Sequence, residues 1–230
     1  MATAERAGRG RGRERPSLDR ESILSGALEL VDREGLGALS MRALAHELGV
    51  GTMSLYHHVP NKEALLDGVV ERLMAEIQIP SAESGSWDQR AARMAGSLRE
   101  VALRHPGCVP LLVTRPFATG PSLQPCEAAF GLLAEAGLDV EQALIAFRTM
   151  VAYVFGWVML ESSGFFGAGG AHREPAWLQE SGLPRLAEMA AHLDGRDLSA
   201  DFDAGLRIVE VGVLTALLGD RPSSGGVRGG

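Results

Sequence analysis

The chain has 230 residues, of which 46% are hydrophobic and only 5% aromatic, so a sizeable and mainly aliphatic core is possible. Its net charge of −7 would by itself argue against a nucleic-acid partner. That charge is uneven, however, because residues 1–60 are neutral overall and the first sixteen residues hold five arginines against two glutamates. The N-terminal segment is therefore locally basic, and the excess of acidic residues lies in residues 61–230.

The sequence gives no sign of a disulfide framework, a secretion signal or a membrane span. Cys108 and Cys126 have no C-x-x-C spacing, and they are too few to form a metal cluster by themselves. Residues 1–16 lack an apolar stretch of the signal-peptide kind. The longest apolar run, Met150–Leu160, has eleven residues and is too short to cross a bilayer. We expect a cytoplasmic protein with no cofactor, no metal and no membrane partner.

The first sixteen residues are expected to form a disordered basic arm, because arginines alternate with glycines and no apolar period is present. A helix follows, with Asp19 as its N-cap and Gly35 just beyond its end. Its apolar positions recur at helical spacing, and they are Ile23, Leu24, Ala27, Leu28, Leu30 and Val31.

Three further helices are predicted before residue 80. Ser40 is a good N-cap for a short helix over Met41–Leu48, which Gly49 would close. A third short helix is expected over 52–58, and Asn61 would cap a fourth that runs to about residue 78. The fourth helix has its apolar positions at Leu65, Leu66, Val69, Val70, Leu73, Met74 and Ile77.

The remainder of the chain also favours helices. No segment alternates between apolar and polar residues with period two, so the predicted fold class is all-α. The glycine-rich stretch "SSGFFGAGGAHREP" is expected to be a mobile loop, and residues 220–230 a disordered tail. Helices are predicted over 87–104, 107–113, 122–136, 139–161, 182–193 and 201–218.

The second and third helices, joined by a glycine turn, describe a helix-turn-helix. Val50, Leu55 and Val59 are the apolar positions of its second helix, and they can pack on the preceding helices. The outward face would consist of Thr52, Met53, Ser54, Tyr56, His57 and His58. Such hydroxyl, imidazole and thioether groups suit base edges, phosphates and thymine methyls in a DNA major groove. Lys62, the only lysine, lies in the first turn of the next helix, where an anion is attracted.

The stretch Ala27–Met74, "ALELVDREGLGALSMRALAHELGVGTMSLYHHVPNKEALLDGVVERLM", resembles the DNA-binding domain of the TetR family of bacterial transcriptional repressors. The resemblance implies an all-α homodimer on double-stranded DNA. Its helix-turn-helix DNA-binding domain would cover 17–62, and a ligand-binding and dimerisation domain would cover 63–219. Carried over, the DNA contacts fall on the outward face described above, on Arg42 and on Lys62.

The later sequence resembles the tetracycline-repressor subgroup through "HPGCVPLLVTRP", "EAGLDVEQALIAF" and "YVFGWVMLE", in that order. The turn Thr114-Arg115-Pro116 matches a ligand-lining turn of the subgroup. Leu111, however, stands where tetracycline repressors place a metal-coordinating histidine. The resemblance therefore implies the subgroup's architecture without its magnesium–tetracycline effector.

A ligand pocket is expected between the helices at 139–161 and 201–218 and the region 87–134. Its predicted lining is Met94, Leu98, Leu111, Thr114, Arg115, Phe130, Phe147, Met150 and Val151. A charged group in apolar surroundings needs a partner, so Arg115 would bind either an anionic or carbonyl-bearing ligand or a nearby carboxylate. The helices expected over 139–161 and 201–218 are apolar nearly all round. This fits either the core of a monomer or, as the resemblance implies, a two-fold interface.

We expect a ligand-responsive repressor that binds a palindromic operator as a homodimer and is released by a small-molecule effector. Two alternatives stay open, namely a DNA-binding regulator without small-molecule control and a redox-sensing regulator that acts through Cys108. The sequence shows no nucleophile–base–acid spacing, no phosphate-cradling glycine loop and no metal-ligand cluster, so no enzyme activity is predicted.

Overall fold

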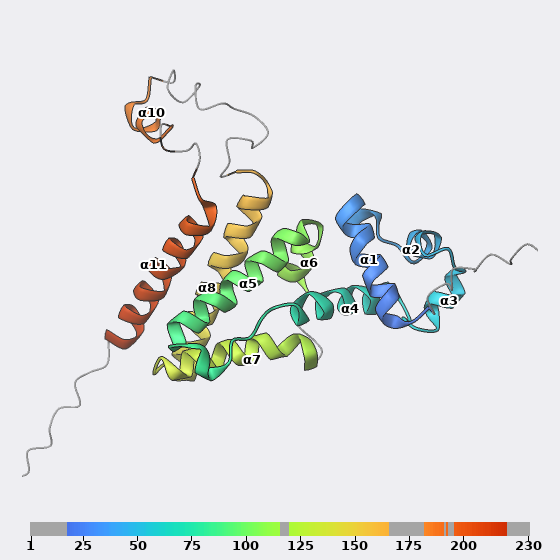
Figure 1. Ribbon diagram of the computed structural model, residues 1–230, viewed down its shortest axis with the longest axis horizontal. Helices are drawn as coiled ribbons and strands as arrows, with labels where there is room; N and C mark the ends of the chain where they lie inside the picture. The colour runs from blue at the N-terminus through green and yellow to red at the C-terminus, as the bar shows by residue number, and fades with distance from the viewer. Residues whose placement is uncertain (1–17, 116–119, 166–181, 191, 193–195, 220–230) are drawn as a thin grey trace, which may run out of the picture.

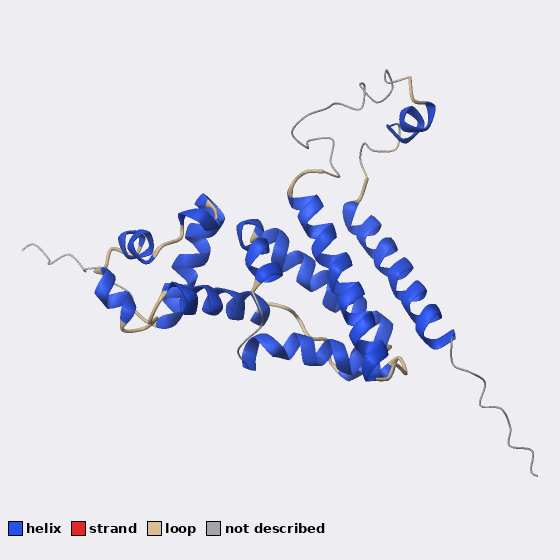
Figure 2. Ribbon diagram, turned by 180° about the vertical axis from the view of Figure 1, so that it is seen from behind, coloured by secondary structure: helices blue, strands red, loops and turns tan. Residues whose placement is uncertain are grey.

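The computed structural model describes residues 18–115, 120–165, 182–190, 192 and 196–219. Over these residues the chain forms α-helices and short 3-10 turns, and no strand occurs in the described part (Figures 1 and 2). The predicted all-α class is confirmed. The expected basic arm, the C-terminal tail and most of the glycine-rich loop lie outside the described residues.

The helices follow the predicted order, and each predicted end agrees with the structure to within three residues. The first four helices are α1 (Arg20–Glu34), α2 (Met41–Glu47), α3 (Thr52–Tyr56) and α4 (Lys62–Ala75). The later ones are α5 (Trp87–Arg104), α6 (Val109–Thr114), α7 (Gly120–Glu135), α8 (Val140–Ser162), α10 (Pro184–Ala190) and α11 (Leu198–Gly219). Three 3-10 turns, η1 (Leu36–Ala38), η2 (Ala82–Ser84) and η3 (Pro106–Cys108), were not predicted.

Side-chain caps fix where the first, second and fourth helices begin. The side chains of Asp19, Ser40 and Asn61 each accept a hydrogen bond from the backbone N–H three residues on, at 2.8, 3.1 and 2.8 Å. Each bond satisfies one of the free donors of a helix start, and such a cap stabilises its helix by about 1 kcal/mol. All three predicted N-caps are confirmed.

Helices α1, α2 and α3 form a small unit at one end of the molecule, and α4 leads from it into the larger helical body (Figure 1). η3 of the larger body packs closely on α1. A Cβ atom added at Gly107 would lie 2.7 Å from the carbonyl oxygen of Val31, so only glycine allows this approach. Next to it, Nδ1 of His105 lies 2.7 Å from the carboxylate of Asp32 on α1. The two units are therefore held together by α4 and by this second contact.

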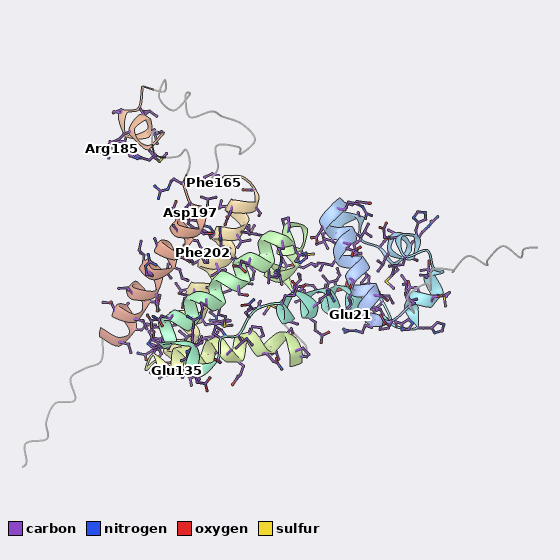
Figure 3. The ribbon with its side chains drawn as sticks, in the orientation of Figure 1. Glu21, Glu135, Phe165, Arg185, Asp197 and Phe202 are labelled. Carbon is purple, nitrogen blue, oxygen red and sulfur yellow. The ribbon has the colours of Figure 1, made fainter. Side chains whose placement is uncertain are left out.

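The larger body is centred on α5, α7, α8 and α11. Phe202 of α11 is 1% exposed, and it faces α8 and α5 (Figure 3). A buried ion pair joins the same three helices, because Nε of Arg99 donates to Glu161 at 2.7 Å and its Nη1 donates to the hydroxyl of Ser199 at 2.9 Å. A buried pair of this kind fixes the orientation of its helices more than it adds stability.

Helix α8 is long and apolar enough to cross a membrane by length and composition, and it is the one such helix in the described part of the chain. The core helix of a soluble protein passes the same test. One side of α8 is indeed core, because Val154 and Val158 are buried beside α5 and α11. The other side is exposed, with Ile145 53% and Met159 51% exposed. Burial within a single chain therefore accounts for only part of its apolar surface.

Candidate DNA-binding surface and ligand cavity

A glycine turn sets the angle between α2 and α3. Gly49 has φ +65°, a left-handed conformation that favours glycine. Its N–H donates to the carbonyl oxygen of His46 at 3.1 Å, and the N–H of Val50 donates to that of Ala45 at 3.0 Å. This pair of bonds is a Schellman motif, which ends α2 and satisfies its last carbonyl groups. The predicted role of Gly49 in closing the second helix is confirmed.

Helix α3 presents one side to the core and the other to solvent. Leu55 is fully buried and Val59 is 2% exposed, while Met53 is 70% and Tyr56 is 41% exposed. The remaining predicted contact residues are also accessible. Thr52 and Ser54 are half-buried, and His57 and His58 are exposed. The structure therefore brings all the predicted recognition residues onto one solvent-facing surface.

The predicted third helix is two residues too long. α3 ends at Tyr56, and the N–H of His58 donates to the carbonyl oxygen of Leu55 at 3.0 Å, which is an i→i+3 bond. The same carbonyl also accepts from the N–H of Val59 at 2.8 Å, so i→i+3 and i→i+4 bonds share one acceptor before Pro60, which cannot continue a helix. His57 and His58 consequently lie in the turn that follows α3.

Two cations flank the α3 surface. Arg42 lies in the first turn of α2 and is exposed. Lys62 is the first residue of α4, is exposed, and makes no ion pair with any described residue. Its neighbour Glu63 is paired with Arg115, whose Nη1 lies 2.9 Å from the Glu63 carboxylate. The start of α4 thus offers a free ammonium group and free N–H groups to an anion.

Replacing Lys62 with alanine is expected to weaken binding to all DNA sequences alike and to lower the salt dependence of binding by about one unit of slope for each subunit bound. The reason is that a phosphate contact releases a counterion but reads no base. The measurement is operator affinity against salt concentration by fluorescence anisotropy. Arg185→Ala, on the distant helix α10, removes the same charge and should leave the slope unchanged. An unchanged slope for Lys62→Ala would rule out the phosphate contact.

An apolar cavity lies in the larger body, between the end of α4 and helices α5, α7 and α8. It encloses about 780 Å³ of space, part of it open to solvent. Its wall is formed by Met74, Ile77, Ala91, Met94, Ala95, Leu98, Pro125, Cys126, Ala129, Leu132, Leu133, Phe147, Met150, Val151, Val154 and Phe155. Apart from the Cys126 thiol, no lining side chain offers a polar group. The cavity wall therefore suits the apolar body of a ligand.

Five predicted pocket residues line this cavity and four do not. The lining ones are Met94, Leu98, Phe147, Met150 and Val151. Leu111 is instead 3% exposed and belongs to the core shared with α1 and α4. Thr114 is exposed, and its hydroxyl donates to the carbonyl oxygen of Pro110 at 2.7 Å. Phe130 lies behind the wall, where its ring stacks on that of Phe147 with centroids 4.7 Å apart.

Arg115, the fourth of these residues, turns away from the cavity toward α4. Its Nε and Nη2 donate to Asp67 at 3.0 and 2.6 Å, and its Nη1 donates to Glu63 at 2.9 Å. The hydrogen bonds to Asp67 and then to Glu63 raise the pKa of Arg115. Of the two predicted partners, a ligand or a nearby carboxylate, the structure shows the carboxylates. Arg115 thereby joins the end of α6 to the first half of α4.

Sequence reasoning missed the part of the wall that α4 provides. Met74, in the last turn of α4, and Ile77, just after its end, line the cavity, whereas the exposed Lys62 begins the helix. Fourteen residues at 1.5 Å per residue span about 21 Å. A single helix therefore connects the predicted DNA-contact residue Lys62 to the cavity.

The two cysteines differ in their surroundings. Cys108 is fully buried, and burial raises the pKa of its thiol to about 12. The thiolate is the reactive form, so this environment argues against a redox sensor at Cys108. Cys126 lies in the cavity wall, and burial raises the pKa of its thiol as well. Among the described residues, no group of three histidine, cysteine or acidic side chains is placed to hold a metal ion.

Residues 23–69 match the family described as "Bacterial regulatory proteins, tetR family", and residues 79–217 match "Tetracyclin repressor-like, C-terminal domain". An HTH-type transcriptional regulator of Saccharopolyspora erythraea is 34% identical over 205 residues, which cover 87% of this chain and 86% of that protein. The tetracycline repressor protein class A from transposon 1721 of Escherichia coli is 33% identical over 217 residues, covering 92% and 98% of the two chains.

Solved structures give the same result. The Streptomyces coelicolor TetR family protein ActR in complex with actinorhodin superposes with a TM-score of 0.73 at 30% identity, over 88% of this chain and 98% of that chain. The matches extend over both the helix-turn-helix and the larger helical body. The chain therefore belongs to the TetR family of bacterial transcriptional regulators.

Proposed function

We propose that this protein is a repressor that binds a palindromic operator as a homodimer and leaves it when a largely apolar small molecule fills the cavity. The observation that carries the proposal is the course of α4, which begins at the exposed Lys62 and has Met74 of its last turn on the cavity wall, with Ile77 lining the wall just after the helix ends at Ala75. Relatives named transcriptional repressors, and the complex of ActR with actinorhodin, support both halves of it.

On DNA, the exposed side of α3 would enter the major groove. The residues that would face base edges and phosphates are Thr52, Met53, Ser54, Tyr56, His57 and His58. Arg42 and Lys62 would hold phosphates on either side and fix the register without reading sequence. A two-fold dimer would place two such helices on one face of the duplex, which is why the operator should be a palindrome.

The exposed sides of α8 and α11 support the two-fold interface. Ile145 and Met159 on α8 are 53% and 51% exposed, and Ile208 and Val211 on α11 are 74% and 63% exposed. The two helices lie side by side (Figures 1 and 2), and each of them exposes apolar side chains to solvent. A surface of this kind marks an interaction site, and a second copy of the chain would cover it.

Two glycines of α11, Gly205 and Gly212, have different surroundings. A Cβ atom at Gly205 would clash with the hydroxyl of Tyr153 in the same chain, so this glycine serves the packing of α11 on α8. Gly212 has open space around its Cα, as a position that faces a second copy would.

Release from DNA requires that the ligand favours a state in which the two recognition surfaces are wrongly spaced. A ligand with equal affinity for both states would shift nothing. Movement of Met74 and Ile77 on the cavity wall would tilt α4 and carry Lys62 with it. The bonds of Arg115 to Glu63 and Asp67 would transmit movement of α6 to the same helix.

Titration of the protein–operator complex with small molecules, with and without magnesium, tests this function. The DNA used for this test is the stretch upstream of the protein's own coding sequence. We expect release by an apolar compound, and we expect no magnesium requirement because Leu111 provides no metal ligand. Release that stopped on addition of a chelator would contradict the magnesium-free site. A regulator without small-molecule control would be indicated if no compound that occupies the cavity changed operator affinity.

A further inference from the structure

A second hollow adjoins the apolar cavity, and it contains a buried cation. It lies between α5, α7 and the segment after α4, and it encloses about 490 Å³, part of it open to solvent. Leu132 lines both hollows, so the two are neighbours across one side chain. Arg90 and Glu135 form the polar part of the second hollow, where the end of α7 meets the start of α5 (Figure 3).

Arg90 is only 7% exposed, yet its hydrogen-bonding groups are incompletely used. Its Nε donates to the carbonyl oxygen of Gly85 at 3.2 Å, and its Nη2 donates to the carboxylate of Glu135. Its Nη1 has no acceptor among the described residues. A guanidinium held away from water needs an anion beside it, and a carboxylate that binds two of its N–H groups is the best match.

The present anion, Glu135, is poorly retained. Its side chain is 51% exposed, in contrast with 8% for its partner Arg90. An exposed carboxylate loses little on returning to water, whereas the buried guanidinium would be left unpaired. An incoming anion can therefore replace Glu135. The hollow favours an anion over a cation because Arg90, the buried member of the pair, is positively charged.

We propose that the second hollow is an anion subsite of the effector cavity. The effector would have an apolar body in the large cavity and a carboxylate on a short arm. That carboxylate would bind Arg90 in place of Glu135, and Glu135 would turn into solvent. This inference rests on the proposed effector cavity, and it adds the chemical class of the ligand and the residue that selects it.

The test compares two fluorescent probes, 1-pyrenebutyrate and 1-pyrenebutanol, which share ring and arm and differ only in the charged end. Their dissociation constants are measured by equilibrium fluorescence for the wild type and for Arg90→Gln, Arg90→Lys and Glu135→Gln. Arg93→Gln is the matched control. Arg93 lies on the same helix and also bonds the preceding segment, through Ser84, but lines neither hollow.

Pyrenebutyrate is expected to bind Arg90→Gln about tenfold more weakly than wild type, because a charge-assisted hydrogen bond is lost. Arg90→Lys should restore part of that loss, and Glu135→Gln should tighten pyrenebutyrate binding. Pyrenebutanol should bind all the variants alike, which also shows that they remain folded. Arg93→Gln should behave as wild type with both probes.

Equal loss of pyrenebutyrate binding in Arg90→Gln and Arg93→Gln would overturn the subsite, since general charge would then explain the effect. Unchanged pyrenebutyrate binding in Arg90→Gln, with pyrenebutanol still bound, would overturn the subsite and leave the apolar cavity standing. Failure of both probes to bind any form would overturn the cavity itself, and the subsite with it.

Discussion

Replacing Ile208 with aspartate is expected to convert the protein to monomers and to weaken operator binding by about 100-fold or more, because two linked half-site contacts become one. Ile208 is 74% exposed on α11, and we propose that a second copy of the chain covers its apolar surface. A charge there would be buried without a partner in the dimer. Sedimentation equilibrium gives the oligomeric state, and anisotropy with a palindromic operator gives the affinity.

Leu123→Asp is the matched control for that change. Leu123 is an exposed leucine on α7, 45% exposed, and it belongs to neither α8 nor α11. It should leave both the oligomeric state and operator affinity unchanged. A variant at Ile208 that remained dimeric with wild-type affinity would contradict the interface.

Single substitutions of Leu55 and Met53, two residues apart on α3, should have different effects. The first should change the stability of the fold, and the second should change DNA binding. Leu55 is fully buried, so Leu55→Ala should lower the free energy of unfolding by about 2–5 kcal/mol through lost burial and the remaining cavity. Met53 is 70% exposed, so Met53→Ala should change that free energy by less than about 0.5 kcal/mol. Its effect should appear in operator affinity instead.

Denaturant unfolding and operator titration of both variants check this pair. If Met53→Ala were as destabilising as Leu55→Ala, the predicted outward face of α3 would be wrong. If Met53→Ala bound the operator as tightly as wild type, Met53 would have no place among the DNA contacts.

The helix-turn-helix could be predicted from the sequence because its determinants are local. The N-caps Asp19, Ser40 and Asn61 act on the residue three positions ahead, and Gly49 acts on its own turn. Hydrophobic spacing then placed Leu55 in the core. These interactions span few residues, so pattern and propensity suffice to find them.

The cavity could be predicted only in part, because its wall depends on contacts between distant segments. Arg115 was expected in the pocket lining, with either a ligand or a nearby carboxylate as its partner, and its partners Glu63 and Asp67 are 52 and 48 residues away in sequence. No spacing rule connects an arginine to carboxylates at that separation. Leu111 was also expected in the pocket lining, but it packs in the core with residues of α1 and α4. Residues on one face of a long helix, such as Phe147, were placed correctly because helical period fixes their direction.

Contacts between distant segments also explain why the sequence did not predict the place of Met74 in the cavity wall or of Arg90 in the second hollow. Met74 was predicted as an apolar position of the fourth helix, but nothing in its spacing indicates that it reaches past the DNA-binding unit into the cavity wall. Arg90 appears in sequence as one of several arginines on an amphipathic helix. Only the packing of α7 against α5 shows that it is buried while Arg93 is not.

The central claim is that filling the cavity weakens operator binding through α4, and the operator affinity of Ala129→Trp tests it without knowledge of the effector. Ala129 lines the cavity, so a tryptophan there would occupy the ligand's space. Ala134→Trp, exposed on the same helix, is the control. Because the chain already has three tryptophans, the emission of the wild type is subtracted from that of each variant, and a blue-shifted difference spectrum would show that the new ring is buried. The account predicts operator binding about tenfold weaker for Ala129→Trp than for wild type and Ala134→Trp, a typical coupling between two sites. Equal operator affinity for all three proteins, with the Ala129→Trp ring buried, would contradict it.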